Sequence, residues 1–142
     1  MAIDSHATTV WQGPLATGSG ITKAASNAFE LPLTWKARAE SRESGTSPEE
    51  LIAAAHASCF AMAISFGLGN AGHPPERLTT SATVTFQPGT GITKIHLTVA
   101  GRVPGLDEEA FKAVAAEAKA GCPVSQALKG VPEITLEATL ES

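Results

Sequence analysis

The amino-acid sequence predicts an α+β fold in which a long central helix packs with a second helix against an antiparallel β-sheet. Residues 51–75 contain no Asp, Glu, Lys or Arg and are rich in Ala, which indicates a buried helix. Residues 78–86 and 92–103 alternate apolar and polar side chains, as half-buried strands do. Residues 107–119 open with acids and end on Lys, which suits the dipole of an amphipathic helix.

Length and charge limit the class of protein. A chain of 142 residues is long enough for one globular domain and short for two, so we expect a single domain over residues 1–142. The net charge is −4, the ten Lys and Arg are scattered and aromatic residues make up 5%, which argues against nucleic acid or an anionic membrane as a partner. The first residues lack the basic and apolar runs of a signal peptide, so we expect a cytoplasmic protein.

Strands are expected before the central helix. Residues 8–11 and 20–23 have the composition of two strands and are interpreted as the arms of a hairpin. Residues 29–39 alternate apolar with other side chains, which predicts a further strand.

The central helix has a clear beginning and end. Ser47 is suited to cap it, Pro48 to occupy its first position and Glu50 to complete a capping box. Glycines and then Pro74 and Pro75 end it. Its length would span a bilayer, but its Ala, Ser and Gly content is poor for insertion. We therefore expect a helix buried on nearly all sides, with a copy of itself as its close neighbour.

The second half of the chain alternates strands and helices. A Gly- and Pro-containing turn at 87–91 separates the two β-rich segments described above. After the amphipathic helix, Gly121 and Pro123 flank a cysteine and begin a short helix over 124–128. Residues 133–140 are expected to form the last strand.

Two cysteines are the main candidates for chemistry. Cys59 lies in the middle of the central helix, where a small apolar core residue is as good an interpretation as a reactive thiol. Cys122 stands at a helix N-terminus, which favours a thiolate, so position alone makes it the more acidic of the two. Cys59 would need a cation from elsewhere to be a thiolate. His56 shares the helix face of Cys59.

Other chemistries are less well supported. A zinc site of His56, Cys59 and Cys122 lacks a fourth ligand and a CxxC motif. A cysteine hydrolase would need a third member and an oxyanion hole, and no motif indicates either. Ser58 and Ser125 have no nucleophile context. Two acids open the central helix, as its dipole favours.

Two separated segments carry a family resemblance. The segments are SPEELIAAAHASCFAMAIS (47–65) and AKAGCPVSQALKG (118–130). They closely resemble the OsmC/Ohr family of bacterial organic hydroperoxide reductases, and their sequences are closer to its OsmC branch than to its Ohr branch. Further similarity lies in ITKIHL (92–97), VPGLD (103–107) and EITLEATLES (133–142), so the resemblance covers the whole chain. It implies an OsmC/Ohr-like fold that forms an intertwined homodimer with two active sites at the subunit interface.

The resemblance also implies the site residues. Cys59 matches the peroxidatic cysteine, Cys122 the resolving cysteine, and Glu49 the family's glutamate, for which capping left no local role. Arg38 matches the arginine that pairs with the thiolate. The turn after Arg38 is one residue longer than the family pattern, so Arg42 is a competitor for this role.

The implied activity is that of a thiol-dependent peroxidase in a stress response. Organic hydroperoxides are reduced to alcohols through a Cys59 sulfenic acid and a Cys59–Cys122 disulfide, and a dithiol, typically a lipoylated protein, reduces the disulfide. No metal, haem or flavin is required. An apolar pocket, for which Phe60 and Met62 are candidate lining residues, should favour bulky organic peroxides over hydrogen peroxide. Two alternatives stay open: a general thiol–disulfide oxidoreductase, and a non-catalytic OsmC-like domain that binds an apolar ligand.

Overall fold

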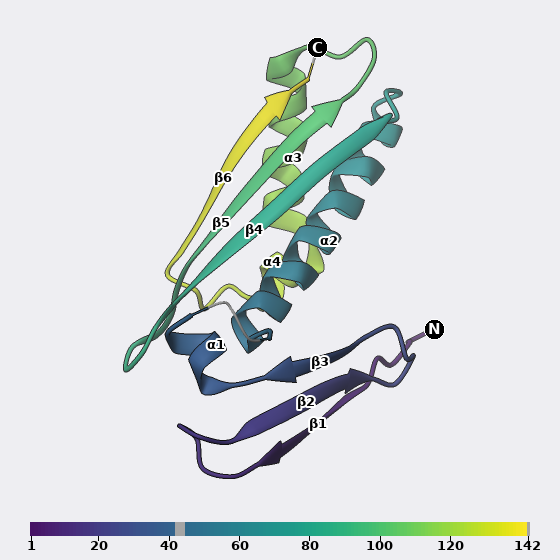
Figure 1. Ribbon diagram of the computed structural model, residues 1–142. Coiled ribbons are helices and arrows are strands. Elements are labelled where there is room, and N and C mark those ends of the chain that lie inside the picture. The colour runs from purple at the N-terminus through teal and green to yellow at the C-terminus, as the bar shows by residue number, and fades with distance from the viewer. Residues whose placement is uncertain (42–44, 142) are drawn as a thin grey trace. The chain divides into compact units, whose positions relative to one another are not determined.

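A computed structural model describes residues 1–41 and 45–141 (Figure 1). The chain divides into two compact units, Met1–Leu51 and Ile52–Ser142. Each unit contains its own three-stranded sheet, and helices accompany both sheets. The predicted α+β class is therefore confirmed.

The first unit contains an antiparallel sheet in the order β1 (Ala7–Gln12), β2 (Ser19–Ala24) and β3 (Glu30–Leu33). The expected hairpin is formed by β1 and β2. Across it the Thr9 hydroxyl donates to Thr22 Oγ1 at 2.9 Å. Such cross-strand hydroxyl pairs stabilise a sheet by a few tenths to about 1 kcal/mol.

The strand predicted over residues 29–39 is wrong in its second half. Strand β3 ends at Leu33, and a short helix α1 (Trp35–Ala39) follows. The cause is Thr34, whose Oγ1 accepts a hydrogen bond from the Ala37 N–H at 3.0 Å and caps the helix. The alternation of side chains continues past the strand, but the cap redirects the backbone. Arg38 therefore lies on a helix and not on a strand.

The central helix α2 (Pro48–Asn70) begins and ends as predicted. Ser47 Oγ accepts a hydrogen bond from the Glu50 N–H at 3.1 Å, which is the expected cap. The Glu50 carboxylate accepts a hydrogen bond from the Thr46 hydroxyl at 2.6 Å. At the other end Gly72 has φ +84°, and the His73 N–H donates to the Leu68 carbonyl at 2.9 Å, a Schellman-type termination.

The second unit contains the sheet β4 (Arg77–Gln87), β5 (Gly91–Arg102) and β6 (Glu133–Leu140). Strands β4 and β5 are antiparallel, whereas β5 and β6 are parallel, which corrects the expectation of an antiparallel sheet. The reason is the crossover: helices α3 (Glu108–Gly121) and α4 (Pro123–Ala127) connect β5 to β6, and such a connection returns the chain in the same direction.

The core of this unit lies between its helices and one face of its sheet (Figure 1). Alternate residues of β5 point into it, as period-two burial requires. The fully buried large side chains of the core come from α2, α3 and β5: Phe60, Ile64, Leu68, Phe111, Ile95 and Leu97. The packing of a central helix and a second helix against the sheet is confirmed.

One strip of α2 is exposed in the single chain. Met62 and Phe66 are 69% and 72% exposed, although both are large and apolar. The expectation of burial on nearly all sides is thus not met within one chain. By length and composition alone α2 could cross a membrane, a property that it shares with core helices of globular proteins.

Candidate active site

The structure brings the two cysteines together. Cys59 is half-buried in α2, and Cys122 is 1% exposed at the junction of α3 and α4. Both thiols are free, and Cys122 is near enough to Cys59 to influence its pKa. Both also line an open cavity together with Met62 and Phe66. Two cysteines that are distant in sequence therefore lie at one candidate site.

The surroundings of Cys59 favour its thiol form. Burial raises the pKa of Cys59, and the hydrogen bond to Cys122 and the charge of that neighbour raise it further. A backbone hydrogen bond from Val124 acts in the opposite direction and lowers this pKa. A Cys59 thiolate at neutral pH thus requires a positive charge from another group.

Cys122 occupies the helix N-cap expected for it. It ends α3 and caps α4, and Pro123 takes the first position of the new helix. The Ser125 N–H donates to Cys122 Sγ at 3.3 Å, and Ser125 Oγ lies 3.1 Å from the same sulfur. Two hydrogen-bonding groups of one serine therefore contact this thiol.

His56 lies on the same helix as Cys59, and its side chain contacts a residue that sequence reasoning missed. Its Nε2 is 2.7 Å from Ser125 Oγ, and the imidazole is fully buried. Burial lowers the pKa of His56, which keeps the ring neutral. No motif indicated Ser125, because its partners are remote in sequence and only the packing of α4 against α2 joins them.

The described ranges 1–41 and 45–141 contain no group of three or more His, Cys, Asp or Glu side chains placed to hold a metal ion. The nitrogen of His56 that contacts another residue faces a serine hydroxyl and not a thiol. This arrangement does not match the zinc site considered for His56, Cys59 and Cys122.

Arg38 and Glu49 form an ion pair within the first unit. Arg38 Nε donates to Glu49 Oε1 at 3.0 Å, and Nη2 donates to Oε2 at 3.0 Å. The Glu49 side chain is 2% exposed and that of Arg38 is 35% exposed. Two parallel bonds hold the guanidinium plane in one orientation. Arg42, the competitor for this role, lies outside the described residues.

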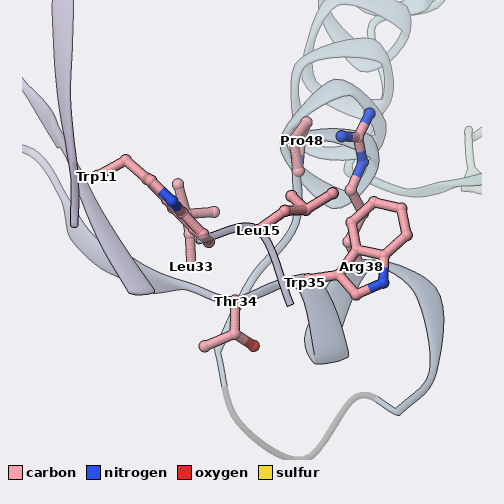
Figure 2. A pocket seen from close by; sticks show the side chains of 7 residues that line it. All are labelled: Trp11, Leu15, Leu33, Thr34, Trp35, Arg38 and Pro48. Atoms are coloured by element: carbon pink, nitrogen blue, oxygen red, sulfur yellow. The ribbon is translucent and has the colours of Figure 1, made fainter. Parts of the chain in front are cut away.

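An apolar cavity adjoins Arg38 in the same unit (Figure 2). Its volume is about 290 Å³. The guanidinium carbon lies 6.0 Å from the centre of the Trp35 ring, within the range of a cation–π contact. The lining residues are Trp11, Leu15, Leu33, Thr34, Trp35, Arg38 and Pro48.

This cavity differs from the one expected. Phe60 is fully buried in the core of the second unit and is not among the residues that line the cavity of the two cysteines. Met62 does line the open cavity of the two cysteines. The walls beside Arg38 come from β1, β3 and α1, and α1 itself was not anticipated. Chemically, they offer a cation next to an apolar surface.

Comparison with known proteins places the chain in a family. The family model described as OsmC-like protein matches residues 41–137. The sequence is 43% identical, over 146 aligned residues and 100% of both chains, to Peroxiredoxin OsmC of Escherichia coli (strain K12).

Solved structures show the same fold. An OsmC-like protein from Mycoplasma pneumoniae has a TM-score of 0.77, 19% identity and 100% coverage of both chains. The organic hydroperoxide resistance protein OhrB of Bacillus subtilis has a TM-score of 0.65 and 22% identity, over 96% of this chain and 98% of that one. The OsmC/Ohr-like fold is thereby confirmed. With a family match over more than half of its length and a 43% identical relative along all of it, the chain belongs to the OsmC-like family.

Proposed function

We propose that this protein is a cysteine-based peroxidase that reduces organic hydroperoxides to alcohols. The observation that carries the proposal is the pair of free thiols, Cys59 and Cys122, that line one open cavity. A reacting thiol and a resolving thiol must approach closely, with Cα atoms within about 7 Å, to form a disulfide. The relative named Peroxiredoxin OsmC, which is 43% identical and aligns along the whole of both chains, supports peroxidase-type chemistry.

The cycle has three steps. The Cys59 thiolate attacks the distal oxygen of the hydroperoxide, an alcohol leaves, and Cys59 becomes a sulfenic acid. Cys122 then attacks the sulfenic sulfur, which gives the disulfide and water. An external dithiol finally reduces the disulfide by exchange. The cycle uses protein thiols and this reductant, for which a lipoyl-type dithiol is our proposal, and no prosthetic group takes part.

Arg38 and Glu49 have complementary roles in the proposal. Cys59 needs a cation, because burial and Cys122 raise its pKa. Arg38 is always charged and can stabilise both the thiolate and a peroxide oxygen. Glu49 orients the guanidinium through two hydrogen bonds.

The apolar cavity beside Arg38 supports an organic substrate. Trp11, Leu15 and Trp35 present apolar surface next to the guanidinium. An alkyl or aryl group gains about 25 cal/mol for each Å² of apolar surface that it buries, and hydrogen peroxide has no such group. We therefore expect faster reaction with bulky organic hydroperoxides.

The proposed working form is a cytoplasmic homodimer with a role in the response to peroxide stress. The exposed Met62 and Phe66 strip of α2 supports the dimer, because apolar side chains that adjoin one another in an exposed patch mark interaction surfaces. The small residues of α2 allow a second helix to approach closely. Interfaces of obligate dimers are typically apolar in this way.

The test is stopped-flow oxidation of the pre-reduced protein by cumene hydroperoxide and by hydrogen peroxide. We expect fast oxidation that favours cumene hydroperoxide in the wild type and is lost in Cys59→Ser. Cys122→Ser is the matched control: it should still consume one equivalent of peroxide but should form no disulfide.

The alternatives give different results in the same experiment. A rate no higher than that of a free thiol would contradict the peroxidase and favour a non-catalytic ligand-binding domain. Indifference to peroxide together with rapid reaction with small disulfides would favour a general thiol–disulfide oxidoreductase.

A further inference from the structure

Three buried side chains of the second unit form a hydrogen-bonded row that ends at Cys122, which shares a cavity with Cys59. His56 Nε2 lies 2.7 Å from Ser125 Oγ, and Ser125 Oγ lies 3.1 Å from Cys122 Sγ. Cys122 and Cys59 line the same cavity, and the neighbouring Cys122 raises the pKa of Cys59. His56, Ser125 and Cys122 are 0%, 6% and 1% exposed, so water does not compete freely for these contacts.

The direction of the row follows from the imidazole. Burial lowers the pKa of His56, so the ring is neutral and carries one N–H. Its Nδ1 has no hydrogen-bond partner among residues 1–41 and 45–141. A buried N–H without an acceptor is rarer and costlier than a bare nitrogen lone pair, so the proton belongs on Nε2. His56 then donates to Ser125 Oγ, and the Ser125 hydroxyl is left to donate to Cys122 Sγ.

We propose that His56 and Ser125 form a relay that positions the Cys122 sulfur for attack on the Cys59 sulfenic acid and stabilises the negative charge that develops on it. This inference rests on the proposed peroxidase and deepens its second step. Two donors of Ser125, the hydroxyl and the backbone N–H at 3.3 Å, point at the sulfur. His56 is a positioning residue, since it acts through Ser125 and contacts no reacting atom.

The step balances without a further reactant. The Cys122 sulfur forms the S–S bond and the S–O bond of the Cys59 sulfenic acid breaks. Cys122 is oxidised and the sulfenic sulfur is reduced. The thiol proton of Cys122, which the relay leaves free to face Cys59, departs with the hydroxyl group as water.

The first test separates the two chemical steps in a single turnover with cumene hydroperoxide. In Ser125→Ala we expect formation of the sulfenic acid at the wild-type rate and disulfide formation slowed about tenfold or more, since a hydrogen bond to a charged atom is lost. Ser125→Thr keeps the hydroxyl and should recover most of the rate. Ser81→Ala removes an exposed hydroxyl on β4 and serves as the control.

The imidazole is tested by two substitutions of different character. His56→Gln keeps an N–H donor near the position of Nε2 and should resolve the sulfenic acid within about threefold of the wild-type rate. His56→Leu removes the donor and should slow resolution about tenfold. Equal slowing in both variants, or in neither, would contradict the relay.

The second test does not require peroxidase activity. In a Cys59→Ser background Cys122 is the one remaining cysteine of the sequence, and its thiolate can be followed by ultraviolet absorbance. Ser125→Ala in this background should move the thiolate titration about one pH unit higher, and Ser125→Thr should restore it. An unchanged titration would overturn the relay even if the peroxidase is active. A shifted titration in a protein that ignores peroxide would support the relay while the proposed function fails.

Discussion

At the scale of single residues, the titratable side chains that are buried within residues 1–41 and 45–141 all belong to the candidate site. Glu49 is 2% exposed and His56 fully buried, and each contacts one polar partner that is far from it in sequence or on another helix. An unpaired carboxylate at this depth would be strongly unfavourable, so Arg38 and Glu49 stabilise each other. The neutral imidazole avoids that cost by not ionising.

His56 should make stability depend on pH. Because burial lowers its pKa, the unfolded chain binds a proton near 6.5 while the folded protein does not. The free energy of unfolding should therefore fall as the pH is lowered from about 7 to about 5. His56→Gln should lose this part of the dependence, as measured by urea unfolding at several pH values. His6→Gln, which removes an exposed imidazole, is the control, and an identical slope in His56→Gln and wild type would contradict the argument.

Among the elements, short segments place the functional groups. Helix α1 comprises one turn and a half, yet it carries Arg38 towards the first turn of α2, where Glu49 lies. Likewise the break between α3 and α4 sets Cys122 at a helix N-terminus. In both places the backbone changes direction at a residue that caps the next helix: Thr34 caps α1 and Cys122 caps α4.

The approach of α3 to β5 depends on a residue without a side chain. A Cβ at Gly101 would lie 2.6 Å from the Phe111 ring, which is fully buried and cannot turn away. We expect Gly101→Ala to lower the free energy of unfolding by about 1–3 kcal/mol, as overpacked cores do. Gly69→Ala is the control, because nothing lies within 4 Å of its Cβ, and urea unfolding compares the two. Equal stability of both variants would show that the core can relax.

For the whole molecule, the exposed strip of α2 is an apolar surface that the packing of a single chain does not explain. Phe66 and Met62 stand four residues apart on one helix face, and both border the open cavity of the cysteines. A second copy that covered this strip would also close the cavity to water. Association and catalysis are therefore expected to depend on each other.

Phe66→Asp should weaken the proposed dimer, because it would place a charge in an apolar interface. Sedimentation velocity should give a dimer for the wild type and a monomer, or a dimer that dissociates at about tenfold or more higher concentration, for the variant. Ile3→Asp introduces the same charge at an exposed apolar residue outside α2 and should leave the dimer intact. A monomeric wild type would contradict the proposal directly.

Local patterns in the sequence were enough to predict most elements. These patterns extend over only a few residues, so they can be recognised without knowledge of the fold; examples are the cap at Ser47, the helix end at Gly72 and the alternation in the strands. The last strand was predicted with its observed bounds, but its parallel pairing depends on the whole crossover. The prediction of a single domain over residues 1–142 stays a prediction.

The candidate site, too, has features that local sequence patterns predict and features that depend on the whole fold. The sequence by itself determined the two cysteines, Glu49 and the family, because these depend on residue identities at characteristic spacings. Only the tertiary structure decided that Ser125 joins His56 to Cys122, and that α1 and β1 wall a cavity beside Arg38. The physical reason is that hydrogen bonds and cavities join groups remote along the chain, and no local periodicity encodes which remote groups will meet.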